Sequence, residues 1–498
     1  MLFNSIQFII FFPTVILVNY LLPGKIRHIW LLMASYYFYM SWNAKYGLLM
    51  LFTTVVTYGG ALLLERTDKK GGPPEKVIRR KKGILACGII LVLLVLGYFK
   101  YFNFACEMLE QLFNVIGLQI SVPRFDILLP VGISFFTFQG MGYMVDVYRK
   151  DTEAEHDILH YALFVSFFPQ LVAGPIERSR SLLKQLSAPR KFNFDLAREG
   201  LLLMLWGYFL KIVMADRIAI FVDTVFGNYT QYTGWYIVVA NFLVAIQIYC
   251  DFYGYSVLAM GAAKFLGINL MENFNAPYFS MSIGEFWTRW HISFCTWLRD
   301  YVYFPLGGSR KGKPRKYLNI MIVFLVSGLW HGATSAYVVW GFIFGLYQVI
   351  GALTRPLRDR IMTKLRLHRE SLGYKIGAII TTFLLQDLLC VFIRSGTVTN
   401  GINIFRNMFS FSNPWILFDG SLYECGLNQQ NFALVMVCMV ILFFADLCKY
   451  KGIEIRKVIL RQDYLFRWIV IAIAVVSILI FGLWGPGYNE QNFIYFQF

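Results

Sequence analysis

A succession of apolar runs, each about long enough to cross a bilayer, is the feature that most constrains this chain. The runs begin at Ser5, His28, Tyr46, Gly83, Leu128, Leu201, Gly234, Tyr317, Ala336, Ile376, Asn431 and Trp468. A helix needs about 20 apolar residues to cross a hydrocarbon core about 30 Å thick. Only 15% of the 498 residues are charged, whereas about a quarter is typical of soluble domains. The sequence therefore predicts an all-α, polytopic integral membrane protein with about ten to twelve transmembrane helices.

Two apolar stretches, residues 164–175 and 249–267, are interrupted by Gly or Pro. Broken segments are stable at membrane depth only when they are buried in protein or face water. We therefore expect re-entrant segments around a central cavity. No Ser-rich, Gln-rich or acidic linker divides the chain, so we predict a single membrane domain over residues 1–498.

The basic residues are concentrated in loops between the apolar runs. The chain has 46 Lys and Arg against 29 Asp and Glu, a net charge of +17. In a soluble protein this balance would suggest nucleic acid, but in a membrane protein it sets the orientation, because basic loops stay in the cytoplasm. We place residues 66–82 there, together with the basic clusters at 310–316, 355–369 and 449–461. The first loop is also suited to contact anionic membrane lipid, and we expect no nucleic acid partner.

The cysteines and most of the histidines give no sign of a metal site. The eight cysteines include no C-x-x-C pair and lie mostly within apolar runs, where they serve as small apolar residues. We therefore expect no metal. Four of the six histidines lie in or beside polar loop sequence, where a solvated position is the ordinary interpretation: His28, His156, His160 and His368. The other two, His291 and His331, each follow a tryptophan.

His331 is the strongest candidate for chemistry. If the run from Tyr317 is helical and begins at the cytoplasmic surface, His331 lies roughly 20 Å into the membrane. Ionisable groups at such depth usually face a cavity or a reaction path. A neutral imidazole there can accept a proton, which is what a general base needs to activate a hydroxyl that attacks a thioester. The alternative is a core histidine bonded to a backbone carbonyl, and for His291 the residues alone favour that alternative.

Charged residues among aromatics follow His291. Arg299 and Asp300 lie in the stretch Trp297-Leu-Arg-Asp-Tyr-Val-Tyr-Phe-Pro-Leu-Gly-Gly, and Arg289 and Glu285 precede it. Such charges are costly in a membrane unless they are paired, so ion pairs of Arg289 or Arg299 with these carboxylates are one interpretation. The other is a basic lining for the phosphates of a soluble cofactor, helped by the basic cluster at 310–316.

Several motifs occur in a recognisable order. They are Gln247-Ile-Tyr-Cys-Asp-Phe-Tyr-Gly-Tyr-Ser, Glu272-Asn-Phe-Asn-Ala-Pro-Tyr, Phe286-Trp-Thr-Arg-Trp-His-Ile-Ser, Trp297-Leu-Arg-Asp-Tyr-Val-Tyr-Phe-Pro-Leu-Gly-Gly and Gly328-Leu-Trp-His-Gly-Ala. Together they resemble the membrane-bound O-acyltransferase (MBOAT) family, in particular its bacterial alginate O-acetylation branch. The resemblance covers a core at about 128–341, and it is weaker in the C-terminal helices and tail at 372–498.

The resemblance implies an activity, a site and partners. It makes His331 the active-site residue and His291 a second active-site position. It implies acetyl-coenzyme A (acetyl-CoA) as cytoplasmic acyl donor, whose binding we assign to Arg289, Arg299, Trp290 and Trp330. It also implies a funnel through the membrane, a bacterial cell-membrane location, and an SGNH-type extracytoplasmic enzyme that completes O-acetylation of a polysaccharide.

The tail Phe493-Ile-Tyr-Phe-Gln-Phe498 places one hydroxyl, that of Tyr495, among apolar residues. An aromatic anchor at the membrane interface is the simpler interpretation. The tail is also similar to a C-terminal Phe-Ile-Tyr motif of this acylation system and of the small protein in teichoic acid D-alanylation. That resemblance implies that Tyr495 carries the acyl group, and a tyrosyl ester is a competent donor because the phenolate is a good leaving group.

Other functions fit parts of the sequence. A transporter or flippase would also have buried histidines and broken helices, but it commonly shows paired halves, and His291 and His331 lack mirrored flanking sequence. D-alanyl or other acyl transfer to a cell-wall polymer is a further alternative, and a structural scaffold in a polymer-export complex is another. The sequence does not name the acceptor polymer and does not exclude an acyl group longer than acetyl.

Overall fold

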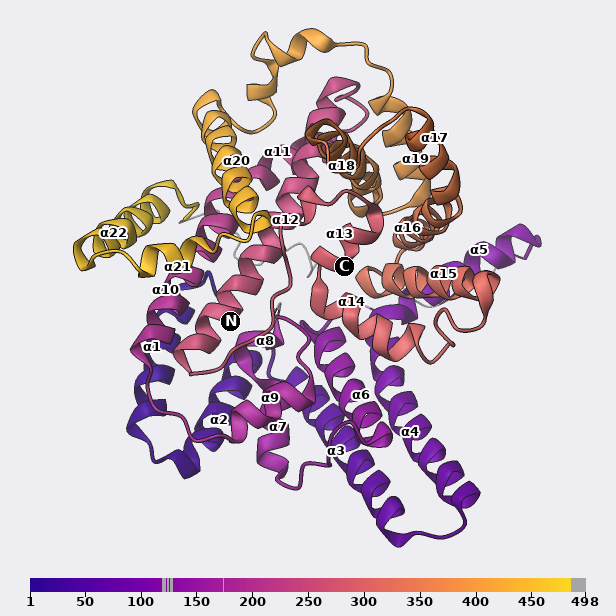
Figure 1. The fold of residues 1–498 in the computed structure, drawn as a ribbon, viewed down its shortest axis with the longest axis vertical. Helices are drawn as coiled ribbons and strands as arrows, with labels where there is room; N and C mark the ends of the chain where they lie inside the picture. Colours follow the sequence, from indigo (N-terminus) through magenta and orange to yellow (C-terminus); the bar gives the residue numbers. More distant parts are fainter. Residues whose placement is uncertain (119–121, 123–124, 126–128, 173, 485–498) are drawn as a thin grey trace. The chain divides into compact units, whose positions relative to one another are not determined.

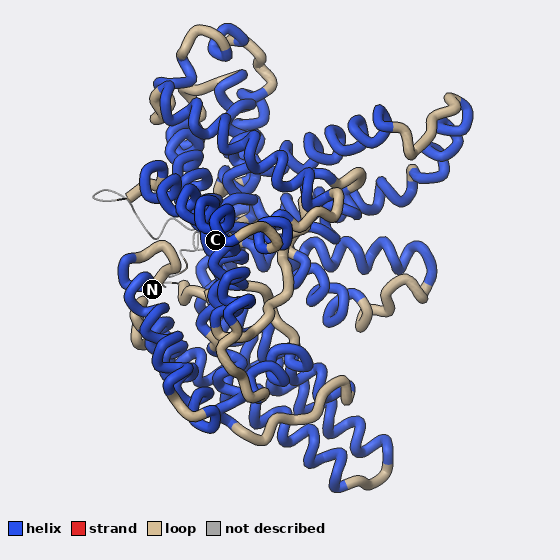
Figure 2. Tube along the Cα trace, turned by 60° about the vertical axis from the view of Figure 1, so that its left-hand side comes forward, coloured by secondary structure: helices blue, strands red, loops and turns tan. Residues whose placement is uncertain are grey.

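The computed structural model of the protein describes all residues except 119–121, 123–124, 126–128, 173 and 485–498. Throughout the described residues the regular secondary structure is helical (Figures 1 and 2). Among them, seven helical segments are long and apolar enough to cross a membrane: Tyr46–Lys70, Pro74–Val115, Trp235–Phe265, Ser335–Leu353, Leu372–Ser395, Gln429–Tyr450 and Tyr464–Phe481. The prediction of an all-α, multi-pass membrane protein is confirmed, and the other apolar runs form shorter or more polar helices.

The chain forms two compact units. Unit 1 comprises Met1–Leu201 and Leu258–Met271, and unit 2 comprises Leu202–Val257 and Glu272–Phe498. The helices α10 (Phe194–Tyr208) and α12 (Trp235–Phe265) each contribute residues to both units. The single domain expected from the sequence stays a prediction.

Unit 1 is built on helical hairpins. Its helices are α1 (Ile6–Leu21), α2 (Arg27–Met40), α3 (Tyr46–Lys70), α4 (Pro74–Leu96), α5 (Phe102–Val115), α6 (Ile133–Arg149), α7 (Ile158–Ser166), α8 (Phe168–Leu171) and α9 (Ser179–Ser187). α3 packs against both α4 and α6, and α2 packs against α7. Lys81 of the basic 66–82 segment is buried in unit 1, where its ammonium group lies 2.6 Å from a carboxylate oxygen of Asp68.

Unit 2 contains the remaining helices. The π-helical turn η3 (Phe209–Ala215) and α11 (Asp216–Gly227) precede α12. After α12 the helices are α13 (Ile283–Arg289), α14 (Ile292–Leu298), α15 (Gly312–His331), α16 (Ser335–Leu353), α17 (Arg355–Lys364), α18 (Leu372–Ser395), α19 (Val398–Met408), α20 (Gln429–Tyr450), α21 (Ile455–Leu460) and α22 (Tyr464–Phe481). α13 and α14 have seven residues each, too few to cross a bilayer. Phe286 and Trp287 of α13 line a cavity, which is described below.

One expected interruption is present and the other is not. The helix does break within residues 164–175, between α7 and α8. The predicted break within 249–267 is wrong, because α12 is helical from Trp235 to Phe265. Gly254 in this stretch serves close packing instead: a Cβ atom there would lie 3.0 Å from the backbone oxygen of Gly207. Small residues at such positions let membrane helices approach closely.

A buried ion cluster joins η3 to α12 within unit 2. The ammonium group of Lys211 lies 2.7 Å from a carboxylate oxygen of Asp216 and 2.8 Å from one of Asp251. The Lys211 side chain is only 1% exposed. A lone charge buried in this way would be very costly, so the three residues stabilise each other as a set.

Glu177 makes the stability of unit 1 depend on pH. It is buried before α9, where its carboxylate accepts a hydrogen bond of 2.6 Å from the backbone N–H of Met271. Burial raises the pKa of Glu177 from 4.5 to about 7. The folded state therefore retains a proton that the unfolded chain has lost, and stability falls as pH rises from about 4.5 to 7, by up to roughly 3 kcal/mol.

We expect Glu177→Gln to remove this pH dependence and to raise the melting temperature above pH 7. The melting temperature of the detergent-solubilised protein, measured between pH 5 and pH 8, tests this expectation. Glu153→Gln, at an exposed position, is the control and should keep the pH dependence. An unchanged pH profile in Glu177→Gln would show that Glu177 does not bind the retained proton.

Candidate active site

The two Trp-His histidines lie side by side in unit 2. His331 is the last residue of α15, and His291 immediately precedes α14. The centroids of their rings are 6.4 Å apart, and the two residues are 6% and 0% exposed. The structure thus brings together the two histidines that were expected to share a site.

The Asn-rich motif at 272–278 holds His291 in place. The backbone N–H of Ile292 donates to the carbonyl oxygen of Asn273 at 3.0 Å, and the N–H of Asn275 donates to that of Arg289 at 2.9 Å. Between these bonds His291 adopts a left-handed backbone conformation, with φ of 43°. Such a conformation is unfavourable for a residue with a side chain. The two backbone hydrogen bonds to the 272–278 segment therefore hold a turn that directs His291 inward.

Aromatic rings surround both imidazoles. Phe252 of α12 meets His291 edge to face at 4.6 Å, and Trp340 of α16 meets His331 in the same manner at 5.1 Å. Trp330 stacks on Phe294 at 4.2 Å. Burial, and then the proximity of His331, lower the pKa of His291 well below its usual range. His291, which lies outside the seven candidate spans, is therefore neutral at physiological pH.

A cavity of about 30 Å³ adjoins His331. Its aromatic wall includes Trp287, Trp290 and Trp340. Gln386 of α18 also lines it and is 6% exposed. Its side-chain nitrogen has no hydrogen-bond partner among the described residues.

Gln386 was missed by the sequence reasoning. The only signal was a polar pair, Gln386-Asp387, inside an otherwise apolar run. Two tyrosines line the same cavity, but their hydroxyl groups donate to backbone carbonyl oxygens, that of Tyr278 to Ala245 and that of Tyr337 to Ile393. The amide of Gln386 and the indole N–H of Trp287, which also has no hydrogen-bond partner among the described residues, therefore remain as donors at the cavity.

The residues expected to bind the donor have mixed surroundings. Trp290 and Trp330 are 7% and 3% exposed, and Trp290 lines the cavity. Arg289 forms an ion pair with Glu285 at 2.9 Å, and the more exposed Arg299 forms one with Asp300 at 3.0 Å. The pairing interpretation is confirmed, and donor binding by these residues stays a prediction.

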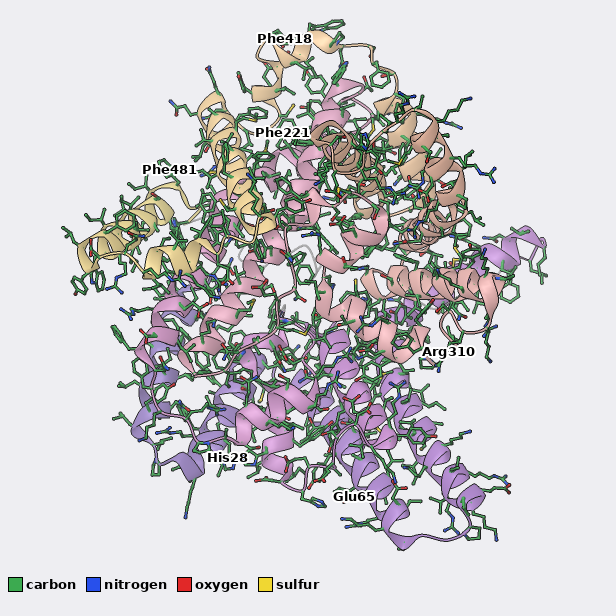
Figure 3. The ribbon with its side chains drawn as sticks, viewed as in Figure 1. His28, Glu65, Phe221, Arg310, Phe418 and Phe481 are labelled. Atoms are coloured by element: carbon green, nitrogen blue, oxygen red, sulfur yellow. The ribbon has the colours of Figure 1, made fainter. Side chains whose placement is uncertain are left out.

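The turn before α15 contains the exposed Arg310, which Figure 3 labels. Tyr495 lies outside the described residues.

Close packing of α15 on α16 fixes His331. A Cβ atom at Gly328 would lie 2.4 Å from the backbone oxygen of Tyr337, and one at Gly341 would lie 2.4 Å from that of Phe324. Both distances are too short for any side chain. The glycine that precedes the Trp-His pair is therefore required for the approach of the two helices that carry the cavity wall.

We expect Gly341→Ala to lower stability by roughly 1–3 kcal/mol, because the added methyl group forces the two helices apart. Displacement of His331 should reduce acyl transfer as well. The matched control is Gly351→Ala in the same helix, where a Cβ atom has open space; it should be neutral or stabilise by up to about 1 kcal/mol. Melting temperatures in detergent compare the two, and equal effects would contradict this account of the packing.

Comparison with known proteins identifies the class. The family model described as MBOAT, membrane-bound O-acyltransferase family, matches residues 148–393, a region that includes His291, His331 and Gln386. The chain is 37% identical over 454 residues to the probable alginate O-acetylase AlgI of Pseudomonas aeruginosa, covering 89% of this chain and 81% of that protein.

Two further relatives are named for cell-wall polymers. The chain is 29% identical over 542 residues to the peptidoglycan O-acetyltransferase of Helicobacter pylori, covering 100% of this chain and 98% of that protein. It is 29% identical over 247 residues to the teichoic acid D-alanyltransferase of Bacillus subtilis, covering 46% and 59%.

The fold and the paired histidines thus belong to a multi-pass membrane enzyme that transfers acyl groups to oxygen. The chain is a member of the membrane-bound O-acyltransferase family.

Proposed function

We propose that this O-acyltransferase takes an acetyl group from cytoplasmic acetyl-CoA and delivers it for O-acetylation of an extracytoplasmic polysaccharide. The observation that carries the proposal is the buried His331 on a small, largely aromatic cavity. The acetyl group and the polysaccharide acceptor are suggested by relatives named as alginate and peptidoglycan O-acetylating enzymes. Which polymer is modified depends on the partner that receives the acetyl group.

His331 acts as the general base in this proposal. It takes the proton of an acceptor hydroxyl, whose oxygen then bonds to the thioester carbonyl carbon. The carbon–sulfur bond breaks, and the coenzyme A thiolate leaves and is protonated. A positioned base of this kind contributes about 10²–10⁴ in rate. The neutral His291 beside it, held by the Asn273–Asn275 segment, keeps the charge around His331 low.

Cavity size supports a short acyl group. About 10–15 Å³ of cavity suffices for one water molecule, so 30 Å³ accommodates a group of two or three heavy atoms, such as acetyl. A long acyl chain would need several of the packed aromatic side chains to move.

Gln386 orients the acyl group. Its amide nitrogen is buried at the cavity and has no other hydrogen-bond partner among the described residues. A fixed donor at this position can bond to the carbonyl oxygen as negative charge develops on it. Removal of one such donor typically costs about 10²–10³ in kcat.

The route out of the membrane uses Tyr495 and a partner. We assign Tyr495, outside the described residues, as the hydroxyl that receives the acetyl group from coenzyme A. The tyrosyl ester then passes it to a serine of an SGNH-type extracytoplasmic enzyme, with the phenolate as leaving group. Arg289, Arg299, Trp290 and Trp330 bind the donor, with the basic turn at 310–316 near its phosphates.

The relay predicts a covalent intermediate. Purified protein given radiolabelled acetyl-CoA should become labelled, and peptide mass analysis should place the label on Tyr495. His331→Ala should lose the label, because the acceptor hydroxyl is no longer activated, and Tyr495→Phe should lose it as well. The exposed His368→Ala is the matched control and should label normally.

The possible results separate the alternatives. Absence of labelling and turnover in every form, with folding confirmed and a partner enzyme added, would reject acetyl-CoA as the acyl donor. Labelling only from a D-alanyl carrier protein would instead favour the teichoic acid type of transfer, which the B. subtilis relative performs according to its name.

Gln386→Leu should lower kcat by about 10²–10³ with a small change in KM, since the lost hydrogen bond strengthens in the transition state. The half-buried Gln348→Leu on α16, outside the cavity lining, is the control and should leave kcat unchanged. An increase in KM alone would mean that Gln386 contributes to ground-state binding and not to the transition state.

A further inference from the structure

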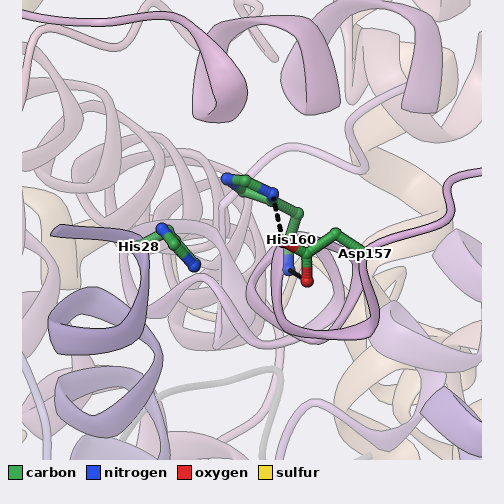
Figure 4. A group of neighbouring side chains, drawn as sticks. All are labelled: His28, Asp157 and His160. Atoms are coloured by element: carbon green, nitrogen blue, oxygen red, sulfur yellow. Dashed lines mark hydrogen bonds and ion pairs between the residues drawn. The ribbon is translucent and has the colours of Figure 1, made fainter. Parts of the chain in front are cut away.

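Unit 1 holds a cluster of potential metal ligands that consists of His28, Asp157 and His160 (Figure 4). One ligand atom from each residue lies within 4.8 Å of the other two. His28 is in the first turn of α2, Asp157 caps α7, and the two helices pack together. We expected both histidines to be ordinary surface residues, because the sequence does not reveal that distant segments bring them together.

The start of α7 fixes the carboxylate. One oxygen of Asp157 accepts hydrogen bonds from the backbone N–H groups of Leu159, at 2.8 Å, and His160, at 3.4 Å. Its other oxygen lies 3.0 Å from Nδ1 of His160. The capping bonds therefore hold Asp157 with one oxygen directed at the imidazole three residues later, on the same turn of helix.

His28 completes the group from the other helix. Its ring faces that of His160 with centroids 4.2 Å apart and an angle of 29° between the planes. The side chains of His160 and Asp157 are 22% and 41% exposed, so an ion from solution has access to the cluster. Two imidazoles and a carboxylate thus border one accessible space.

We propose that His28, Asp157 and His160 bind one Zn²⁺ ion, with water in the remaining coordination position. Two nitrogen donors and one carboxylate oxygen suit zinc and similar divalent transition metals, whereas Ca²⁺ and Mg²⁺ prefer oxygen ligands. Bonds of about 2.0–2.2 Å in a tetrahedral site place ligand atoms roughly 3.3 Å apart. The stacked imidazoles must rotate so that their ring nitrogens converge at that spacing, and the ion then links the start of α2 to α7.

The loop before α7 indicates which compartment supplies the ion. The hydroxyl of Tyr58 donates to the backbone oxygen of His156 at 2.7 Å, and the imidazole of His156 lies 3.1 Å from a carboxylate oxygen of Glu65. These bonds tie the loop to the C-terminal half of α3, which leads into the basic segment 66–82. Figure 3 labels His28 and Glu65 toward the end of unit 1 that carries the α3–α4 turn. Since we place that segment in the cytoplasm, the site takes its ion from there.

Zinc titration of the full-length protein in detergent tests the proposal. After removal of metal by a chelator, the protein should take one equivalent of Zn²⁺ from a competing chromophoric chelator. Loss of a residue that only orients a ligand typically costs about 10- to 100-fold in affinity. His28→Ala, His160→Ala and Asp157→Asn each remove or weaken a ligand and should therefore cost at least about 100-fold. Asp157→Asn retains an oxygen for the helix cap.

His156→Ala is the matched control, because His156 is an exposed histidine of the same loop that lies outside the cluster. It should bind zinc like the unchanged protein. Zinc should also raise the melting temperature of the unchanged protein and of His156→Ala, but not that of His28→Ala. The melting temperature of each variant without metal establishes that the variant is folded. If Asp157→Asn proves to be destabilised, the zinc affinity of His28→Ala decides the test.

Three results would overturn the site. The first is that the protein fails to take one equivalent of zinc from the chelator. The second is retention of full affinity in His28→Ala and His160→Ala. The third is an equal loss in His156→Ala, which would show that zinc binds to surface histidines in general. Co²⁺ gives an independent result, since a bound tetrahedral ion should produce visible absorption bands that His28→Ala lacks.

Discussion

The internal pairing of polar groups on α12 is the constraint on which unit 2 depends. Most of this helix is buried, 83% of its apolar window against at most 39% for the other candidate spans. A buried helix has no water to satisfy its polar side chains, so each must find a partner in protein. Four of them do so within unit 2: Asn241 with Asp387, Tyr249 with Asp446, Asp251 with Lys211, and Ser256 with Asn273. Each pair joins α12 to a different segment, and two of these segments, α18 and the motif at 272–278, contribute residues to the cavity wall.

The active site inherits its geometry from that arrangement. Ser256 contacts Asn273, whose backbone oxygen receives the N–H that follows His291. Asp387, bonded to Asn241, adjoins Gln386 on α18. The cavity thus has one wall on α18 and another on the α15–α16 hairpin. Both walls are held by packing and hydrogen bonds between residues that do not take part in the proposed reaction. A substitution in the polar pairs should disturb catalysis through position and not through loss of a reacting group.

The sequence was sufficient for the class of fold, because apolar run length is a local signal, and it singled out His331 as a candidate, whereas His291 was singled out only through the family resemblance. Apolar run length identifies spans, and His331 is conspicuous as an imidazole in an apolar run. Gln386 was not predicted, since its proposed function depends on a cavity formed by residues far apart in the chain. The continuity of α12 was also missed, because glycine serves equally as a helix breaker and as a contact residue, and only the position of Gly207 decides between them. The His28 cluster escaped for the same reason, as it needs α2 beside α7.

An acyltransferase must protect its activated acyl group from water, and the walls of this cavity suit that need. The cavity beside His331 has room for a few heavy atoms and is bordered mainly by aromatic rings. A general base, the function proposed for His331, is effective toward water as well as toward a hydroxyl, so selectivity against hydrolysis cannot come from that residue itself. It must come from excluding water while the acyl group is present. The aromatic packing of Trp287, Trp290 and Trp340 around the cavity suits this purpose, and it leaves the proposed base His331 and the proposed donor Gln386 to act on the acyl group.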